Sequence, residues 1–446
     1  MSTHSQGVPL VRAARGVGFL STWHQVVGAA ALPEAPRRRG RRARVPLGDV
    51  LAALTYHVVQ GTGTLAQHFT QLFGATWADS SWSDRRQRLP WDIFAELMRR
   101  VLQPRATPAH ADAFWRGWRL LALDGTQFSL TNTAQVRATR RKTSSRRGRA
   151  AFAKLTAAVL VELGLHNPVA AGIGRAGESE WALAVQLLAA LPAQALLLGD
   201  RLYGCAAFAA PALAACHRVG SHVLLRARML IKPEVQRRLA DGSRLIRVPV
   251  RDPDHPHRIV EWLALREIRV RVGRPGHRAR VLRLWTSLLD PSTAPAQELA
   301  ELYAHRWEHE LYFREIKRQL RHTAVLQSHT VHTGAQEIAA IVLASAVLAH
   351  ERLTAAGDKV APLRISFAKL LLGTQSMYLT VAVSDGVITD DQLQTLMTRS
   401  YAALRTYVTP ARRARSCPRK VRQPIKRWPR LLRNESIEGP FHLEIL

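Results

Sequence analysis

The middle of this 446-residue chain alternates short apolar runs with helical patterns. Buried strands are about four to eight residues long and core helices about ten or more, so such short runs favour strands. The runs lie at residues 120–123, 155–161, 169–173, 195–198, 223–225 and 281–285, and helical patterns lie between some of them at 178–191 and 206–215. Strands that alternate with helices predict a mixed α/β domain.

A second pattern interrupts this domain. Between residues 226 and 280 polar and apolar residues alternate, with Gly, Pro and Asp at the turns, which predicts a β-rich insertion. Helical patterns dominate on both sides of the domain, and the two longest predict helices at 296–320 and 335–353. The expected order is a basic N-terminal arm (1–46), a helical domain (47–105), the α/β domain (115–225 and 281–330) with its insertion (226–280), a helical C-terminal region (331–410) and a basic tail (411–446).

The charge of the chain points to a polyanionic partner. Sixty-four Lys and Arg against 33 Asp and Glu give a formal net charge of +31. Arginine forks match phosphate oxygens in bidentate pairs, and an extended basic surface gains affinity by releasing counterions from nucleic acid. Basic runs at 37–44, 137–149 and 412–433 are expected either to contact phosphates or to remain solvated.

Cysteine usage and hydropathy exclude other classes of protein. Cys205, Cys216 and Cys417 are odd in number and lack zinc-ligand spacing, so neither a disulfide framework nor a zinc finger is expected. The N-terminus lacks a basic region followed by an apolar one. The longest apolar run, residues 338–349, is shorter than the about 20 residues that span a bilayer. We expect a cytoplasmic protein with no membrane partner.

One short helix in the N-terminal helical domain has the composition of a DNA-reading element. Residues 80–89 begin with serines suited to cap a helix and carry Arg85, Arg86 and Arg88. Arginines that project from one short helix are typical of a recognition helix in the major groove. A basic surface helix without a DNA contact explains the same residues, so both interpretations stay open.

Two aspartates follow apolar runs of the α/β domain. Asp124 comes after residues 120–123 and precedes Gly125-Thr126, and Asp200 comes after residues 196–199. We expect both to lie at strand ends, where a single aspartate usually serves as a turn or cap residue. Two such residues in one domain also bring carboxylates close enough to share divalent ions, and Mg²⁺ prefers oxygen ligands.

The most informative segment is the expected helix that begins near Tyr303. At about 100° per residue, Arg306, Glu310 and Lys317 lie within about 60° of Tyr303, and Arg314 and Arg321 extend the same stripe. A stripe with one acid among a hydroxyl and several cations is a poor core face and suits phosphate binding. A solvated helix with incidental Glu/Lys pairs is the alternative.

The other faces of this helix are expected to play different roles. Apolar residues at positions 302, 313, 316 and 320 form an adjacent face that docks on the domain. Glu308 and Glu315 point about 120° to 140° away from Tyr303, which excludes them from the stripe. His305 and His309 are expected at the helix surface, because no HExxH motif surrounds them.

These motifs together resemble those of a known family. Tyr303, Arg306, Glu310 and Lys317 match the spacing Tyr, two residues, Arg, three residues, Glu, six residues, Lys that marks the insertion-sequence-four branch of bacterial transposases. Asp-Gly-Thr at Asp124 and Gly-Asp-Arg-x-Tyr-Gly at Asp200 look like the first and second acidic motifs of that branch. The resemblance covers roughly residues 47–353.

The resemblance implies a ribonuclease-H-like α/β fold with a mixed sheet and a two-metal mechanism. Asp124, Asp200 and Glu310 would be the catalytic ligands of Mg²⁺, for which Mn²⁺ may substitute. Tyr303, Arg306 and Lys317 would hold a phosphate, and Arg201 and Arg314 would add DNA contacts.

The implied partners are double-stranded DNA and a second copy of the chain. The DNA would be the terminal inverted repeats of an insertion sequence and the target DNA, bound by a homodimer in a synaptic complex. A chain that acts on this DNA would be cytoplasmic and nucleoid-associated. A metal-dependent nuclease or junction resolvase without strand transfer is one alternative. A non-catalytic protein that binds terminal repeats is the other.

Two further motifs need separate interpretations. Some relatives carry a base-stacking tryptophan on the last strand of the insertion, where this chain aligns Leu282, with Trp285 nearby. Gly172-Ile-Gly174-Arg-Ala-Gly177 matches a dinucleotide fingerprint. However, Glu178 and Glu180 then open the next helix, where pyrophosphate requires positive potential, and this excludes the ligand.

Overall fold

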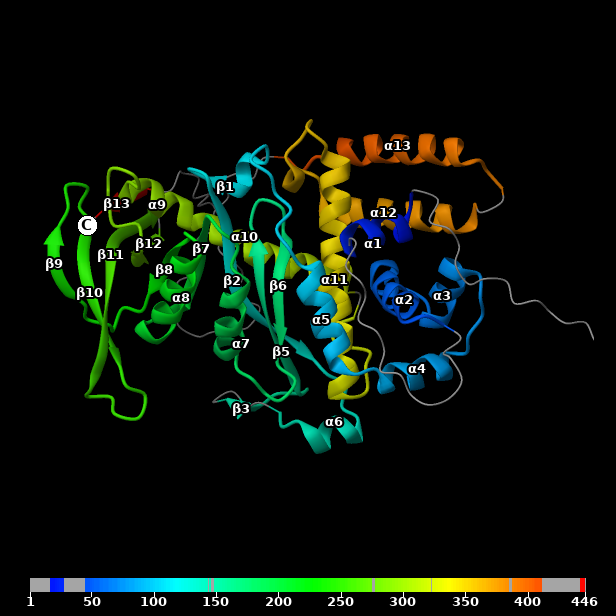
Figure 1. Ribbon diagram of the computed structural model, residues 1–446, viewed down its shortest axis with the longest axis horizontal. Coiled ribbons are helices and arrows are strands. Elements are labelled where there is room, and N and C mark those ends of the chain that lie inside the picture. Colours follow the sequence, from blue (N-terminus) through cyan, green and yellow to red (C-terminus); the bar gives the residue numbers. More distant parts are fainter. Residues whose placement is uncertain are drawn as a thin grey trace, which may run out of the picture. The chain divides into compact units, whose positions relative to one another are not determined.

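The computed structural model describes residues 17–27, 45–142, 144–145, 148–274, 277–321, 323–384, 387–410 and 442–445 (Figure 1). These residues form two compact units. The first comprises residues 1–196, 218–221 and 306–408, and the second residues 197–217, 222–305 and 409–446. The arginines expected in the N-terminal arm at 37–44 and the basic tail at 412–433 lie outside the described residues.

The first unit contains an antiparallel sheet with the strand order β6-β5-β2. Its strands and short connections are β1 (Phe114–Trp115), β2 (Trp118–Ser129), α6 (Ala134–Thr139), the ribbon β3 (Ser144–Ser145) and β4 (Gly148–Arg149), β5 (Lys154–Glu162) and β6 (Asn167–Ile173). The apolar runs expected to be strands at 120–123, 155–161 and 169–173 lie in β2, β5 and β6. Helix α7 (Glu180–Leu187) packs against β5, and the hydroxyl of Ser179 caps its first turn.

Helices build the rest of the first unit. They are α1 (Phe19–Val27), α2 (Leu47–Gln60), α3 (Leu65–Phe73), α4 (Asp79–Arg88), α5 (Trp91–Val101), α10 (Trp307–Arg314), α11 (Val331–Ala356), α12 (Phe367–Val383) and α13 (Asp390–Thr406). Helix α11 lies at the centre of this packing and contacts α2, α5 and β6. Among the described residues, α11 alone is long and apolar enough to cross a membrane, but 83% of that window is buried inside the protein. It is therefore a core helix.

The second unit is rich in strands. It contains β7 (Ala195–Gly204) from residue 197 onward, α8 (Ala206–Arg218), β8 (His222–Ala227), β9 (Glu234–Arg238), β10 (Arg244–Arg251), β11 (Ile259–Arg274), β12 (His277–Thr286), α9 (Ala296–Leu302) and β13 (His442–Ile445). Its strand order is β7-β8-β12-β11-β10-β9, and β13 pairs with β11. The residues of the expected insertion (226–280) lie in β9, β10, β11 and the start of β12, and the last part of β12 pairs with β8. The predicted α/β class is confirmed.

The prediction of one continuous helix over 296–320 is wrong. A 3₁₀ turn (Tyr303–Arg306) separates α9 from α10, and a π-helix (Glu315–Leu320) follows α10. Residues up to His305 belong to the second unit and those from Arg306 to the first. A 3₁₀ turn has about three residues per turn and a π-helix more than an α-helix, so a constant 100° per residue does not describe this segment.

Candidate active site

Asp124 and Asp200 lie inside their strands and not at strand ends. Strand β2 continues five residues past Asp124 to Ser129, and β7 continues four residues past Asp200 to Gly204. An aspartate directly after an apolar run was expected to end the strand. Pairing with a neighbouring strand decides otherwise, because Asp124 lies opposite Val159 of β5 in an unbroken register.

Arg306 joins two of the expected site acids. Its Nη1 lies 3.6 Å from Oδ2 of Asp124, and its Nη2 donates a hydrogen bond of 2.8 Å to Oε1 of Glu310. The three side chains are 15%, 18% and 39% exposed, so the cluster is partly shielded from solvent and still open to it. Glu310 also lies in the first turn of α10, where the helix dipole favours a carboxylate.

The donor set at this cluster fits a hard divalent cation. Two carboxylates converge on one positive group, the Arg306 guanidinium, and carboxylate oxygens are the ligands that Mg²⁺ prefers. Across the described part of the chain, no group of three or more His, Cys, Asp or Glu side chains is arranged to hold a metal ion. The contacts with Arg306 bring two acids together, Asp124 and Glu310.

Asp200 and Tyr303 belong to the second unit. Oδ1 of Asp200 accepts a hydrogen bond from the backbone N–H of Leu202 at 2.6 Å. Tyr303 is buried, and its hydroxyl donates to the carbonyl oxygen of Gly199 at 3.2 Å. Arg201 is exposed on the same strand. Tyr303 thus contacts the backbone directly before Asp200.

Lys317 and Arg321 lie further along the first unit. The ammonium of Lys317 is 5.4 Å from the centre of the Phe128 ring, and the Arg321 guanidinium is 5.2 Å from it. Burial lowers the pKa of Lys317, and the positive charges of Arg321 and Lys154 lower that pKa further. Arg314, at the end of α10, is exposed.

Comparison with known proteins connects this geometry to a family. The model of the family described as "Transposase DDE domain" matches residues 115–345, more than half of the chain. The chain belongs to the DDE transposase family.

The transposase InsG of insertion sequence element IS4 from Escherichia coli (strain K12) is 28% identical over 362 residues, which cover 79% of this chain and 78% of that protein. A solved piggyBac transposase synaptic complex with hairpin DNA aligns with 86% of this chain and 81% of that chain, at a TM-score of 0.43 and 9% identity. The match to the IS4 transposase agrees with the branch expected from the motifs.

Glu308 and Glu315 of this transposase face away from the acid cluster, as expected. Both contact His166: Nε2 of His166 lies 3.0 Å from Glu308, and Nδ1 lies 2.8 Å from Glu315. Arg352 of α11 also bonds Glu315 at 2.9 Å. These two glutamates therefore belong to a buried charge network that connects α10 to the sheet and to α11.

His309 corrects another expectation. It is fully buried and not at the helix surface, and its imidazole bonds the carbonyl of Val159 at 3.0 Å. Burial lowers the pKa of His309 to about 3, so the ring is neutral and donates to this carbonyl. His305 is exposed, as expected.

Glu180, which the sequence placed only at the start of a helix, is a neighbour of the site. A Cβ atom added to Gly125 would overlap the Cγ and Cδ atoms of Glu180. Gly125 directly follows Asp124, so α7 packs against the backbone that carries the first acid. The glycine of the Asp-Gly-Thr motif was the available signal, since a glycine inside a strand often marks a close approach.

The three arginines expected on a recognition helix point in different directions. Arg85 donates to the carbonyl of Val45 at 2.6 Å and lies over Trp77. Arg86 donates to Ser328 Oγ and to the carbonyl of Thr333, at the start of α11. Arg88 is 73% exposed and forms a long ion pair of 3.9 Å with Asp84. Two of the three arginines thus secure α4 to the protein, and Arg88 is directed to solvent.

Trp285 is unsuited to the base-stacking role weighed for the last insertion strand. It is fully buried, and its Nε1 lies 3.3 Å from Oε2 of Glu267. Glu267 is also bonded by the buried Arg283 at 2.6 Å. Exposing the indole would therefore break a buried ionic network of the second unit.

Proposed function

We propose that this transposase cleaves DNA at the ends of an insertion sequence and transfers the 3′ end to a new strand by metal-dependent phosphoryl transfer. Asp124, Asp200 and Glu310 are the proposed catalytic residues and ligands of Mg²⁺, with Mn²⁺ as a substitute. The observation that carries the proposal is the convergence of Asp124 and Glu310 on Arg306. Bound divalent ions would activate a water and then a 3′-hydroxyl, and would stabilise the leaving oxygen.

The remaining residues of the site bind and orient the DNA in this proposal. Arg306 offsets part of the negative charge of the two acids in the absence of DNA, and its guanidinium is placed to contact a phosphate brought to them. Lys317, Arg314 and Arg201 supply further positive charge along the DNA backbone. Tyr303 acts mainly by holding Gly199 and, with it, the backbone next to Asp200.

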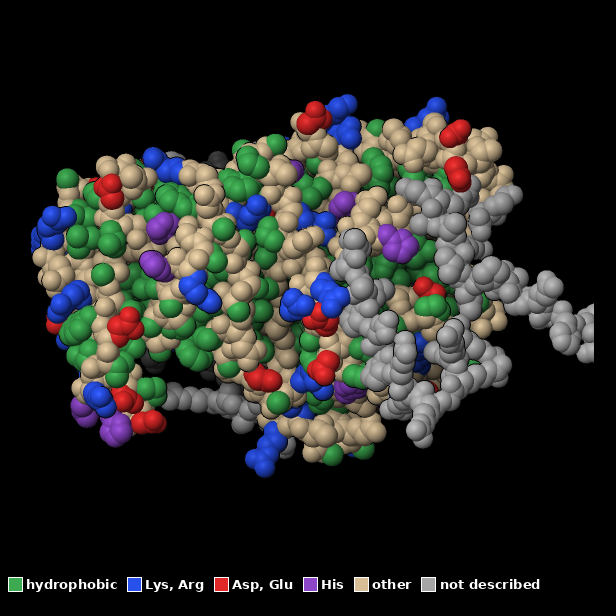
Figure 2. Space-filling view, in the orientation of Figure 1, with side chains coloured by type: hydrophobic (Ala, Val, Ile, Leu, Met, Phe, Trp, Pro, Cys, Tyr) green, Lys and Arg blue, Asp and Glu red, His purple; other side chains and the backbone are tan. Residues whose placement is uncertain are grey.

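The proposed partners are the terminal inverted repeats, the target DNA and a second copy of the chain. Figure 2 shows Lys and Arg side chains spread over the visible face among acidic ones, not gathered in one patch. We therefore expect that DNA bound on this face would be held by many separate contacts between phosphates and single Lys or Arg side chains. The proposed DNA-binding domain at 47–105 adds Arg88 as its exposed arginine, with Arg85 and Arg86 as supports. We place the protein in the cytoplasm, at the nucleoid.

The triad is tested by replacing each acid with its amide: Asp124→Asn, Asp200→Asn and Glu310→Gln. Each replacement should lower the rate of cleavage of an element-end duplex in Mg²⁺ by about a thousandfold or more, because metal ions supply several kcal/mol of transition-state stabilisation. Affinity for the duplex should stay the same or rise, because removal of a negative charge does not weaken phosphate contacts.

Glu308→Gln is the matched control for this test. It removes the same charge from the same helix but faces His166. Normal cleavage by Glu310→Gln, or an equal loss in Glu308→Gln and Glu310→Gln, would contradict the assignment. Joining of a 3′-hydroxyl donor end to a target duplex then separates a transposase from a nuclease or resolvase, because only strand transfer yields the joined product.

A further inference from the structure

Two cations of the first unit rest on one aromatic ring. Lys317 lies in the π-helix, Arg321 directly follows it, and both are about 5 Å from the centre of the Phe128 ring (5.4 and 5.2 Å). A π-helix has more than four residues per turn, so it changes the directions of the side chains that follow α10. Phe128 itself is 1% exposed and lies on β2, four residues after Asp124. One strand thus carries the first site acid and the ring beneath both cations.

The two cations lack a carboxylate partner in the described part of the chain. Arg321 donates one bond, to the carbonyl of Thr323 at 2.8 Å, and its buried Nε has no partner among the described residues. Glu337 is the acid that acts electrostatically on Arg321, but its oxygens accept bonds from Gln327 and Ser328. Like charges held together without a counter-ion repel, so the pair is suited to receive an anion.

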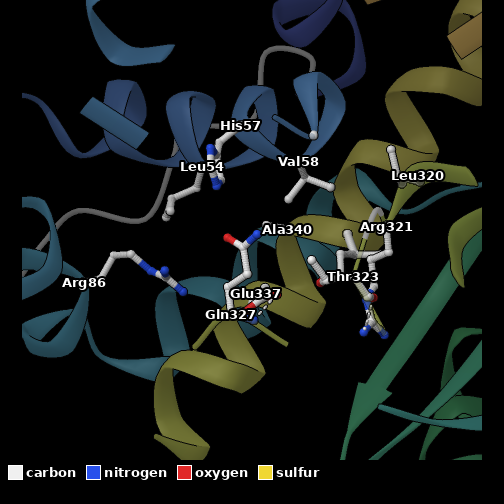
Figure 3. Close-up of a pocket in the computed structure, with 12 residues that line it drawn as sticks. Leu54, His57, Val58, Arg86, Leu320, Arg321, Thr323, Gln327, Glu337 and Ala340 are labelled. Atoms are coloured by element: carbon white, nitrogen blue, oxygen red, sulfur yellow. Dashed lines mark hydrogen bonds between the residues drawn. The ribbon is translucent and has the colours of Figure 1, made fainter. Parts of the chain in front are cut away.

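A ligand has access to Arg321. The guanidinium lines a pocket of about 70 Å³ between α2, α4, α11 and the end of the π-helix. Figure 3 shows Arg86 and Arg321 on opposite sides of this pocket. Buried Nε–H donors without partners are uncommon in native proteins, and both arginines lining this pocket have one in the described structure. An anionic oxygen at its edge would satisfy such a donor.

We infer that Lys317 and Arg321 form a two-cation clamp for a single backbone phosphate of the DNA, and that Phe128 is the positioning residue that holds both cations. The inference deepens the proposed function and depends on it. Lys317 alone was expected to bind the phosphate. Arg321 and Phe128 are added by their placement on the same ring. The negative face of the ring attracts both cations. This attraction keeps the ammonium and the guanidinium close to each other when no DNA is bound.

The clamp predicts that both cations contact one and the same phosphate. Binding of the full chain to an element-end duplex is measured in EDTA, with uncharged methylphosphonates introduced at one phosphate after another. Lys317→Gln and Arg321→Gln should each weaken binding to the unmodified duplex about tenfold or more, as for hydrogen bonds to a charged group. A single methylphosphonate position should weaken binding by the wild-type protein, and that same position should weaken binding by either variant less, because only one cation of the pair remains to contact it.

Three other variants keep this test specific. Arg399→Gln removes the same charge from an exposed position of α13 and should leave the response to every methylphosphonate as in wild type. Arg321→Lys should restore part of the affinity and of the sensitivity at the shared position. Phe128→Leu keeps both charges but removes the ring that positions them. The loss of binding caused by methylphosphonates should then be spread over several neighbouring positions. Thermal unfolding of each variant checks that the fold is retained.

The outcomes distinguish this inference from the proposed function. If Arg321→Gln binds like wild type, or if the two cations map to different phosphates, the clamp is wrong even when cleavage depends on the three acids. If the wild-type protein binds DNA through the clamp but does not cleave it, the proposed function fails and the clamp stands.

Discussion

The hydroxyl of Tyr303 donates a hydrogen bond to the carbonyl oxygen of Gly199 at 3.2 Å. Gly199 directly precedes Asp200 in β7, and Tyr303 is 7% exposed. The phenol therefore fixes the backbone beside the second acid of the proposed triad. The motif tyrosine was expected to hold a phosphate, whereas in this structure its hydroxyl is directed at the protein.

Replacement of Tyr303 by Phe tests this relationship. The variant loses one hydrogen bond, which contributes about 1 kcal/mol to the free energy of unfolding, and leaves the Gly199 carbonyl without this donor. We expect single-turnover cleavage to fall severalfold while the affinity for DNA stays unchanged. A loss of affinity with a normal cleavage rate in the bound complex would instead show that the hydroxyl contacts DNA.

Gly125→Ala tests the close approach of α7 to β2. The new methyl group would overlap Glu180, so we expect the free energy of unfolding to fall by about 1–3 kcal/mol, as for other overpacked positions. Because the clash is with one side chain, Glu180→Ala in the same protein should recover most of the loss. Chemical denaturation of the two single variants and the double variant measures this coupling, and additive effects would contradict it.

The buried network around His166 predicts a pH dependence of stability. Burial opposes ionisation of Glu315, but Arg352 and His166 outweigh it and hold the pKa of Glu315 at about 2, below its usual 4.5. Burial also opposes protonation of His166, but Glu315 and Glu308 outweigh it and raise the pKa of His166 above 6.5. The stabilisation from Glu315 is therefore complete above pH 4.5 and is lost as the pH falls towards 2. That from His166 is complete below pH 6.5 and is lost as the pH rises through the raised pKa.

Glu315→Gln is the variant that measures this effect. Loss of the carboxylate leaves Arg352 and His166 without their shared buried partner, so the free energy of unfolding should fall by about 3–5 kcal/mol between pH 4.5 and 6.5. Denaturation curves of both proteins from pH 3 to 8 should converge towards low pH. A constant difference over the whole range would exclude a charge effect. Because Glu315 is needed for stability, it is unsuitable as a neutral control for catalysis.

Glu351 of α11 connects the C-terminal helices to α1. Its buried carboxylate accepts hydrogen bonds from the hydroxyls of Thr22 (2.6 Å), Tyr378 (2.6 Å) and Tyr401 (2.7 Å). Glu351→Ala leaves three hydroxyls without this acceptor and should lower the free energy of unfolding by about 3 kcal/mol or more. Tyr401→Phe removes one donor and should cost about 1 kcal/mol. If both variants lost the same free energy of unfolding, Glu351 would not accept hydrogen bonds from all three hydroxyls.

Much of the local structure could be read from the sequence. The apolar runs at 120–123 and 155–161 lie in strands β2 and β5, and the alternating pattern after residue 226 lies in the meander of β9 to β12. The sequence also placed Arg306 and Glu310 on one face of the helix, and the two side chains form an ion pair there. Periodicity and spacing are local properties, so they predict what neighbouring residues do.

Other features required the tertiary structure. The Tyr303 hydroxyl, the buried His309 ring and the inward-directed Arg86 find their hydrogen-bond partners at Gly199, Val159 and Thr333. Each partner lies more than 100 residues away in the chain. The sequence by itself determined most of the elements, the family and the acids to examine. Only the tertiary structure decided which side chains meet, because burial and hydrogen bonding join segments whose separation no local pattern records.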